Sequence, residues 1–403
     1  MCGPTERAGM DVDLSPLRAY LDAENLDGYL IDADGTDADQ RYVSGFGAPD
    51  PYQTLVTRDG VHLLVSGLEY GRATNEAAAD TVSNTAAYDG QSLLAEYGPY
   101  EGRMRLLARF LDDHGVESLA VPQECPAGTV DGLREQGLSV TVETDGVVAD
   151  IRAIKTDREI EFIRETQAAN QRAMVVAERL IATADVRDGT LYHDGEVLTS
   201  ERVTTEIEIA LLREGCALDE TIVACGAQAA DPHDRGSGPL EADESIVIDI
   251  FPRDKETKYF GDMTRTFVRG TPSDELARRY EVTREAFEAA LDAVEPGTTG
   301  AVVHDVVCDV IEEAGYETLR SDPETDTGFI HGTGHGVGLD IHEGPRLSFT
   351  GGELEVGHVI TIEPGLYDPA VGGVRIEDLV VVTEDGYENL TDYPISIDPQ
   401  DRS

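Results

Sequence analysis

The sequence predicts a mixed α/β (α+β) protein with two domains, and three features of the chain lead to that prediction. Helices and strands alternate in the first part, a long helix with its own start signal begins soon after residue 153, and the last third contains two β-hairpins with acidic residues inside apolar strands. A chain of 403 residues is long enough for two or three domains. We expect one domain over residues 1–152 and a second over 153–403.

Local signals define the elements of the first domain. Ser15 and Pro16 are typical of an N-cap followed by the first residue of a helix, and YQTLVTRDGVHLLVS predicts a hairpin that turns at Asp59-Gly60. LDGYLID and ESLAVP predict strands, and an amphipathic helix over 103–114 precedes the second of them. No catalytic set of residues is visible here. We therefore expect this domain to wall off a substrate cleft or to form a subunit interface.

The second domain begins with a capping box formed by Thr156 and Glu159, followed by several turns of helical periodicity. VRDGTLYHDGEVLTSERV predicts an inserted turn or short hairpin, and the helices TTEIEIALLREG, SDELARRYEVTREAFEAALDAV and TGAVVHDVVCDVIEEAG follow along the chain. We expect His193 to be a solvated loop residue and His304 to be structural.

Five residues of metal-ligating type are spread over the last third of the chain. They are Asp249 in SIVIDIFP, Asp262 in YFGDMTRTF, His335 in HGTGHGVGLDIHEGP, Glu363 in ITIEPGLYDP and Glu377 in GVRIEDLVVV. In such an acidic chain they could be scattered surface acids. However, Asp249 and Glu363 interrupt apolar strands, where an unpaired charge is costly. This context favours a binding site.

The acidic residues fall on two predicted hairpins. If the first turn is centred between Lys255 and Glu256, Asp249 and Asp262 face each other across the hairpin. The second hairpin turns near Ala370, from which Glu363 and Glu377 are equally distant. Directly opposed strand residues point to the same face. Two hairpins could therefore clamp a metal pair from both sides.

Four carboxylates and one imidazole make a hard, oxygen-rich ligand set. Such a set suits two divalent cations better than one structural zinc, with Mn²⁺ preferred and Co²⁺, Fe²⁺ or Zn²⁺ as alternatives. The four negative charges of the carboxylates would balance the four positive charges of two divalent ions. A hydroxide bridging the two ions could then act as a nucleophile at neutral pH.

The words around these residues, TRT, GTGHGVGLDIHE, EPG and VRIED, resemble those of the M24 metallopeptidases, which include the Xaa-Pro dipeptidases (prolidases) and aminopeptidase P. The resemblance covers nearly the whole chain. It implies a pita-bread catalytic domain after a creatinase-like N-terminal domain, with the five residues above as metal ligands. The gap between Asp249 and Asp262 is two residues longer than is usual in the family. An even insertion keeps both side chains on one face, so we expect a longer hairpin tip.

The same resemblance implies roles for further residues. Glu363 is similar to the ligand that also shuttles a proton, and His342 to the histidine that stabilises the tetrahedral intermediate. His233 resembles a histidine that contacts the substrate near the scissile bond. Three residues, His331, Arg375 and Tyr367, resemble groups of the substrate pocket and its support. For each histidine, the alternative interpretation is a structural role.

The resemblance implies a metal-dependent exopeptidase acting on Xaa-Pro bonds of small peptides, either as an aminopeptidase or as a dipeptidase. Two alternatives stay open. One is a metal-dependent pita-bread hydrolase or lyase acting on a non-peptide small molecule. The other is a binding module without catalysis, which the retention of all five ligands disfavours.

The formal net charge of −49 limits the kinds of partner that the protein can bind. Nucleic acids and anionic membranes would be repelled. A disordered chain does not fit this composition, because 40% of the residues are hydrophobic and the acidic residues are interspersed with periodic apolar positions. We interpret the charge as that of a folded protein from the salt-rich cytoplasm of a halophilic archaeon, where molar salt screens the repulsion.

The five cysteines contain no CxxC pair and predict a reduced, cytoplasmic protein. No secretory signal and no apolar run long enough to span a membrane occurs in the sequence. The first nine residues are expected to be disordered, with Met10 as an alternative start of translation. Relatives of this kind are commonly dimers or tetramers, so we expect a homodimer or homotetramer.

Overall fold

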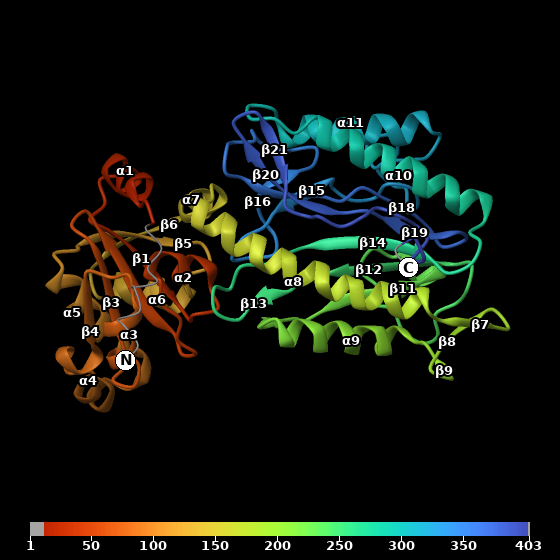
Figure 1. The fold of residues 1–403 in the computed structure, drawn as a ribbon. Coiled ribbons are helices and arrows are strands. Elements are labelled where there is room, and N and C mark those ends of the chain that lie inside the picture. The colour runs from red at the N-terminus through yellow and green to blue at the C-terminus, as the bar shows by residue number, and fades with distance from the viewer. Residues whose placement is uncertain (1–11, 402–403) are drawn as a thin grey trace. The chain divides into compact units, whose positions relative to one another are not determined.

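The computed structural model describes residues 12–401. The expected disorder of the first nine residues, and the question of Met10, lie outside the described part. Two compact units divide the chain, Met1–Arg152 and Ala153–Ser403. Figure 1 shows each unit as a layered arrangement of strands and helices.

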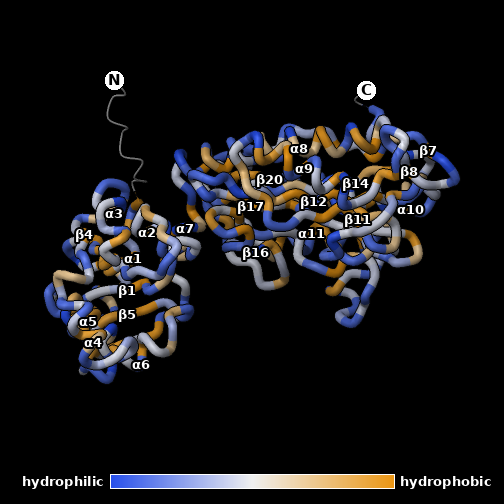
Figure 2. The backbone as a smooth tube through the Cα atoms, turned by 90° about the horizontal axis from the view of Figure 1, so that it is seen from below, coloured by the Kyte–Doolittle hydropathy of each residue, from blue (hydrophilic) through white to orange (hydrophobic). Residues whose placement is uncertain are grey.

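A six-stranded sheet with the order β4-β3-β2-β1-β5-β6 forms the centre of the first unit. Its strands are β1 Gly28–Ala33, β2 Tyr52–Thr57, β3 Val61–Val65, β4 Thr81–Asn84, β5 Ser118–Pro122 and β6 Ser139–Glu143. Its helices are α1 Ser15–Ala23, α2 Ala38–Ser44, α3 Tyr70–Glu76, α4 Gly90–Tyr97, α5 Pro99–Asp113, α6 Ala127–Glu135 and α7 Val147–Ala153. Buried side chains from β1, β5 and α5, among them Leu30, Leu119 and Phe110, form its core. In Figure 2 the orange colour of hydrophobic residues marks parts of β1 and β5.

The predicted β2–β3 hairpin is present, but its turn lies one residue earlier than predicted, at Arg58-Asp59 rather than at Asp59-Gly60, because Val56 pairs with Val61 and the Thr57 amide donates to the Gly60 carbonyl across the turn. The predicted N-cap of the first helix is wrong by one position. Helix α1 begins at Ser15 itself, and the Ser15 amide and hydroxyl both donate to the Asp13 carboxylate. Ser15 is therefore the first residue of the helix, and Leu14 takes the N-cap position without a side-chain hydrogen bond.

Four long helices cover the strands of the second unit, namely α8 Asp157–Ala182, α9 Ser200–Arg213, α10 Asp274–Asp292 and α11 Gly300–Glu313. The capping box of Thr156 and Glu159 is present at the start of α8, as predicted. In Figure 1 the strands lie between the pair α8 and α9 and the pair α10 and α11. Met174 and Ile207 of the first pair pack with Ile248, whereas Phe287 and Val307 of the second pack with Ile360.

Fifteen strands of the second unit form several small sheets. The three-stranded sheet has the order β11-β12-β14 and the five-stranded sheet the order β16-β15-β17-β20-β21, while β7-β8-β9, β10-β13 and β18-β19 pair separately. Their bounds are β7 Asp185–Arg187, β8 Thr190–His193, β9 Glu196–Val197, β10 Cys216–Ala217, β11 Thr221–Cys225, β12 Ser245–Ile250, β13 Arg253–Asp254, β14 Met263–Val268, β15 Gly334–Gly336, β16 Glu343–Leu347, β17 Val359–Ile362, β18 Gly365–Asp368, β19 Gly372–Arg375, β20 Asp378–Thr383 and β21 Gly386–Asn389. Strands β7, β8 and β9 form the hairpin predicted as an insertion.

The register of the second acidic hairpin is confirmed. Ile362 pairs with Asp378 on one side of the acids, and Gly365 pairs with Arg375 on the other. Both pairs are centred on Ala370, so Glu363 and Glu377 lie at equivalent positions in the two strands.

The predicted register of the first acidic hairpin is wrong by two residues. Asp249 pairs with Thr264 rather than with Asp262, which directly precedes β14. The reason lies at the tip, where the Asp254 amide donates to the Tyr259 carbonyl and closes a four-residue turn over 255–258. This turn is centred one residue later than predicted. The shift is even, so Asp249 and Asp262 still belong to one face of the hairpin.

None of the helices within residues 12–401 is both long and apolar enough to cross a membrane.

Candidate metal centre and active site

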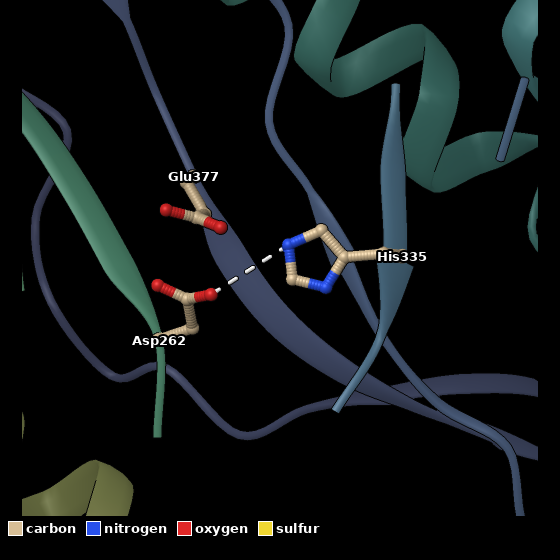
Figure 3. A group of neighbouring side chains, drawn as sticks. All are labelled: Asp262, His335 and Glu377. Carbon is tan, nitrogen blue, oxygen red and sulfur yellow. Dashed lines mark ion pairs between the residues drawn. The ribbon is translucent and has the colours of Figure 1, made fainter. Parts of the chain in front are cut away.

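The five candidate ligands lie together in one cavity of about 680 Å³ in the second unit. Three of them, Asp262, His335 and Glu377, each offer a ligand atom within 4.8 Å of the others. Figure 3 shows these side chains converging from β14, β15 and the start of β20. The His335 Nε2 atom lies 3.8 Å from Asp262 Oδ2 and 3.3 Å from Glu363 Oε1. Asp249 also lines the cavity, so both hairpins contribute to one site.

The backbone on either side of Glu363 and Glu377 explains how they reach the cavity. The β17–β20 ladder ends at Ile362 and the β18–β19 ladder begins at Gly365, so the two glutamates occupy the gap between them. There the Glu363 amide donates to the Thr333 carbonyl, and the Glu377 amide donates to the Thr264 carbonyl. The second hairpin is thereby joined to the segment before β15 and to β14.

Burial dominates the electrostatics of the carboxyl groups. It raises the pKa of Asp262 and Glu377 well above the usual range, with repulsion from neighbouring carboxylates as the next cause. Burial also raises the pKa of Glu363 to about 7, although the Arg375 guanidinium opposes the shift. Arg375 and the more distant Arg346 carry too little positive charge to balance four carboxylates, so the group requires further positive charge to be fully ionised.

His335 has the form that a metal ligand needs. Its Nδ1 lies 3.1 Å from the Gly336 carbonyl oxygen, which places the ring proton on Nδ1 and leaves the Nε2 lone pair facing the carboxylates. Burial lowers the pKa of His335 to about 3, with the neighbouring His342 as the next cause. The imidazole is therefore neutral at physiological pH.

Asp249 supplies an independent test of whether the residues fit a metal ion. Its Oδ2 accepts a hydrogen bond of 2.7 Å from Arg375, whereas its Oδ1 is buried and has no hydrogen-bond partner within the described residues. An unsatisfied buried carboxylate oxygen costs about 1–3 kcal/mol or more. A divalent cation at this atom would satisfy it, and the oxygen-rich donor set suits a hard divalent ion.

The predicted histidines line the same cavity in different settings. The His342 ring contacts the His335 ring edge to face, with 4.4 Å between centroids, and burial followed by the Arg346 charge lowers its pKa. His233 is exposed, on the segment after β11. Both imidazoles can therefore reach a substrate held above the carboxylates.

Tyr367 connects two of the predicted pocket residues. Arg375 donates to the Tyr367 hydroxyl at 3.0 Å, and that hydroxyl lies 2.9 Å from the His331 Nε2 atom. The His331 Nδ1 lies 2.7 Å from the Gly332 carbonyl oxygen, so the proton of this neutral ring is on Nδ1. His331 and Arg375 line the cavity, whereas Tyr367 is fully buried and lies behind them.

The sequence reasoning did not single out Arg346, which lines the cavity directly opposite His335 in the β15–β16 pair. No hydrogen bond or ion pair of its side chain is formed within residues 12–401. The signal was an arginine four residues after His342 in a chain with far more acids than bases. Several apolar lining residues were also missed, namely Ile222, Phe251, Ile330 and Ile341.

Comparison with known proteins gives consistent matches. Residues 161–384 match the model of Metallopeptidase family M24, and residues 14–154 match the Creatinase/Prolidase N-terminal domain. The Xaa-Pro dipeptidase of Pyrococcus horikoshii is 28% identical over 389 residues, which cover 95% of this chain and 97% of that protein.

Solved structures extend the likeness over the whole chain. The prolidase from Pyrococcus horikoshii OT3 matches with a TM-score of 0.78 and 27% identity, covering 95% of this chain and 99% of that chain. The X-Pro aminopeptidase from Thermotoga maritima MSB8 matches with a TM-score of 0.74 and 27% identity, covering 93% and 97%. These matches confirm the expected fold, a creatinase-type N-terminal domain followed by a pita-bread catalytic domain.

Proposed function

Because this chain belongs to metallopeptidase family M24, we propose that it is a metal-dependent exopeptidase that hydrolyses Xaa-Pro peptide bonds, with dipeptides as its preferred substrates. One observation carries the proposal. Five ligand-type side chains line one cavity, and one of them, Asp249, has a buried oxygen without a partner among the described residues. The proposed ligands are Asp249, Asp262, His335, Glu363 and Glu377, holding two divalent ions.

The chemistry that such cations supply when bound is the activation of water as a nucleophile near neutral pH. Glu363 accepts the proton as the water attacks the scissile carbonyl, and it then gives the proton to the leaving proline nitrogen as the C–N bond breaks.

Histidines of the cavity act on the substrate in this proposal. His342 donates an N–H hydrogen bond to the carbonyl oxygen as negative charge develops on it. His233, at the exposed edge, contacts the substrate near the scissile bond. His331 and Arg375 form the wall of the pocket, and Tyr367 holds them in place through its hydroxyl.

Arg346 supports the preference for dipeptides over longer peptides. The C-terminal proline of an Xaa-Pro dipeptide carries a carboxylate, which a guanidinium binds through two parallel hydrogen bonds. In an Xaa-Pro-Pro tripeptide an amide replaces that carboxylate. The alternative is an Xaa-Pro aminopeptidase, which the likeness to the Thermotoga maritima structure supports.

Further proposals concern the setting of the enzyme. We propose Mn²⁺ as the bound ion, with Co²⁺, Fe²⁺ or Zn²⁺ as alternatives, and a homodimer or homotetramer as the assembled state. The net charge of −49 supports a cytoplasm rich in salt, of the halophilic archaeal kind. A protein fully stable and active in dilute buffer would contradict the last of these proposals.

The test compares hydrolysis of an Xaa-Pro dipeptide, its Xaa-Pro amide and an Xaa-Pro-Pro tripeptide, each with a proline-free control. The assay runs in molar KCl with Mn²⁺ or Co²⁺ and an EDTA blank. We expect EDTA-sensitive cleavage before proline, fastest for the dipeptide. Failure of folded, metal-loaded protein to cleave any peptide would contradict the proposal and favour a non-peptide substrate or a binding role.

Substitutions at two arginines distinguish the proposed dipeptidase from an aminopeptidase. Arg346→Met should lower kcat/KM for the dipeptide by about 10-fold or more, because a charge-assisted bond contributes about 1.5–3 kcal/mol, and should leave the amide substrate little changed. Arg235→Met is the matched control, since Arg235 also lines the cavity but pairs with Glu220. Equal losses for dipeptide and amide would contradict the proposed carboxylate contact.

A further inference from the structure

One glutamine side chain of α8 uses every polar group of its carboxamide in hydrogen bonds to distant segments of the chain. Gln167 is fully buried, and its carboxamide contacts the backbone of Asp262, which lies 95 positions further along the chain. The Gln167 Oε1 atom accepts from the Asp262 amide at 2.9 Å, and Nε2 donates to the Asp262 carbonyl at 2.8 Å. Its second N–H donates to the Thr391 hydroxyl at 2.8 Å. Every hydrogen-bonding hydrogen of the amide is therefore engaged.

The two hydrogen bonds from Gln167 take the place of a neighbouring strand beside Asp262. β14 lies at an edge of the three-stranded sheet, so the outward amide and carbonyl of Asp262 have no partner strand there. Gln167 offers one acceptor and one donor to the same residue, as a strand neighbour would. The Asp262 peptide is therefore fixed by a side chain rather than by a ladder.

Gly261, the residue before Asp262, shows how closely helix α8 approaches the hairpin. A Cβ atom on Gly261 would lie 2.7 Å from Gln167 Oε1 and 3.1 Å from its Cα, so only glycine admits the helix at this distance. One turn along α8, the side-chain Nδ2 of Asn170 donates to the backbone carbonyl of Ile250 at 2.6 Å, next to Asp249. Helix α8 thus contacts the backbone at or beside both aspartates of the site.

We propose that Gln167 is a positioning residue for the metal site: its carboxamide fixes the Asp262 backbone so that the carboxylate points toward His335 and Glu377. Groups that orient a ligand contribute to metal affinity although they do not touch the ion. The inference rests on the proposed metal site. It adds a residue of α8, a helix that contributes no side chain to the lining of the cavity.

The experiment is a calorimetric titration of EDTA-treated protein with Mn²⁺ and with Co²⁺ in molar KCl. Gln167→Met keeps the size of the side chain and removes both hydrogen bonds to Asp262. We expect its metal affinity to fall by about 10- to 100-fold. Gln171→Met is the matched control, because Gln171 lies on the next turn of α8 and its side chain, within residues 12–401, donates only to the Leu390 carbonyl, at 3.5 Å. It should bind metal as the wild type does.

A second variant covers the case in which Gln167→Met does not fold. Thr391→Val keeps Gln167 but removes the hydroxyl that accepts from its carboxamide and from the Leu379 backbone amide, so a smaller loss of affinity in the same direction is expected. Unchanged affinity in folded Gln167→Met, or equal losses in Gln167→Met and Gln171→Met, would overturn the positioning role. A wild type that binds neither metal would instead overturn the proposed metal site itself.

Discussion

The two acidic hairpins of the catalytic domain contribute two carboxylates each, but they fix them by different means. The β17–β20 hairpin keeps the register expected from its symmetry about Ala370, and backbone carbonyls of neighbouring segments bind the amides of Glu363 and Glu377. The β12–β14 hairpin is displaced by two residues, and a helix side chain, Gln167, binds Asp262.

The difference lies in the tips and edges of the hairpins. The second tip spans residues 369–371, with the Asp368 carboxylate accepting from the Ala370 amide at 2.9 Å. The first tip needs a four-residue turn, in which the Asp254 carboxylate accepts from the amides of Glu256 and Thr257. A turn held by such local side-chain bonds sets the register of the whole hairpin. The unequal turns thus leave Glu363 and Glu377 directly opposed but Asp249 and Asp262 two residues out of register.

The largest expected effect tests whether the two hairpins form one site. Glu363→Gln keeps the shape of the side chain but removes the proton acceptor, so we expect kcat for an Xaa-Pro dipeptide to fall about 100- to 10,000-fold. Asp249→Asn, on the other hairpin, should also lose most activity and bind less metal. Metal content by mass spectrometry and steady-state kinetics check both. A fall below about tenfold in Glu363→Gln would contradict the assigned role.

The next effect concerns the connection between the hairpins. Arg265 of β14 is fully buried and pairs with Asp378 of β20 at 2.7 Å. Arg265→Met leaves a buried carboxylate without its cation, so the free energy of unfolding should fall by about 3–5 kcal/mol in urea denaturation.

Two further variants sharpen that result. The double variant Arg265→Met/Asp378→Asn should recover part of the stability, because it removes the stranded charge. Arg284→Met, which breaks exposed ion pairs on α10, should cost about 1 kcal/mol or less. If Arg265→Met were as mild as Arg284→Met, the buried pair would not join the hairpins energetically.

A smaller effect is expected at the first tip. Asp254→Ala removes the acceptor for two backbone amides of the turn and should lower the free energy of unfolding by about 1–2 kcal/mol. Asp385→Ala, in the exposed β20–β21 turn, is the control and should stay within about 0.5 kcal/mol of the wild type. Equal effects in urea denaturation would show that the turn does not depend on Asp254.

The smallest effect is a pH dependence at the second tip. The Ala370 amide, and after it the Arg279 guanidinium, hold the pKa of Asp368 below its usual range. A depressed pKa stabilises the fold above the unfolded value of about 3.9, and that contribution is lost as pH falls through the folded value. The stability difference between wild type and Asp368→Asn should therefore shrink below about pH 4. A difference independent of pH between 3 and 6 would contradict this assignment.

Local sequence predicted what depends on local chemistry. The capping box of Thr156 and the symmetric second hairpin are confirmed, because turn and cap residues act over a few positions. The β2–β3 hairpin forms as predicted, but its turn lies at Arg58-Asp59, one residue before the predicted Asp59-Gly60. The pairing partner of Asp249 could not be predicted, because the sequence of the tip is compatible with a turn centred between Lys255 and Glu256 or with one centred a residue later. Gln167 and Arg346 were not found because their roles come from contacts between distant segments and from the cavity.

The most direct test is the anomalous scattering of crystals of Mn²⁺-loaded protein. The account predicts two metal peaks per chain, about 3.5–4 Å apart, bound by the carboxylates of both hairpins and by His335 Nε2. The Asp249 Oδ1 atom, which has no hydrogen-bond partner in the described part of the chain, should coordinate one of them. A single peak, or peaks away from Asp249 and Asp262, would contradict a site shared by the two hairpins.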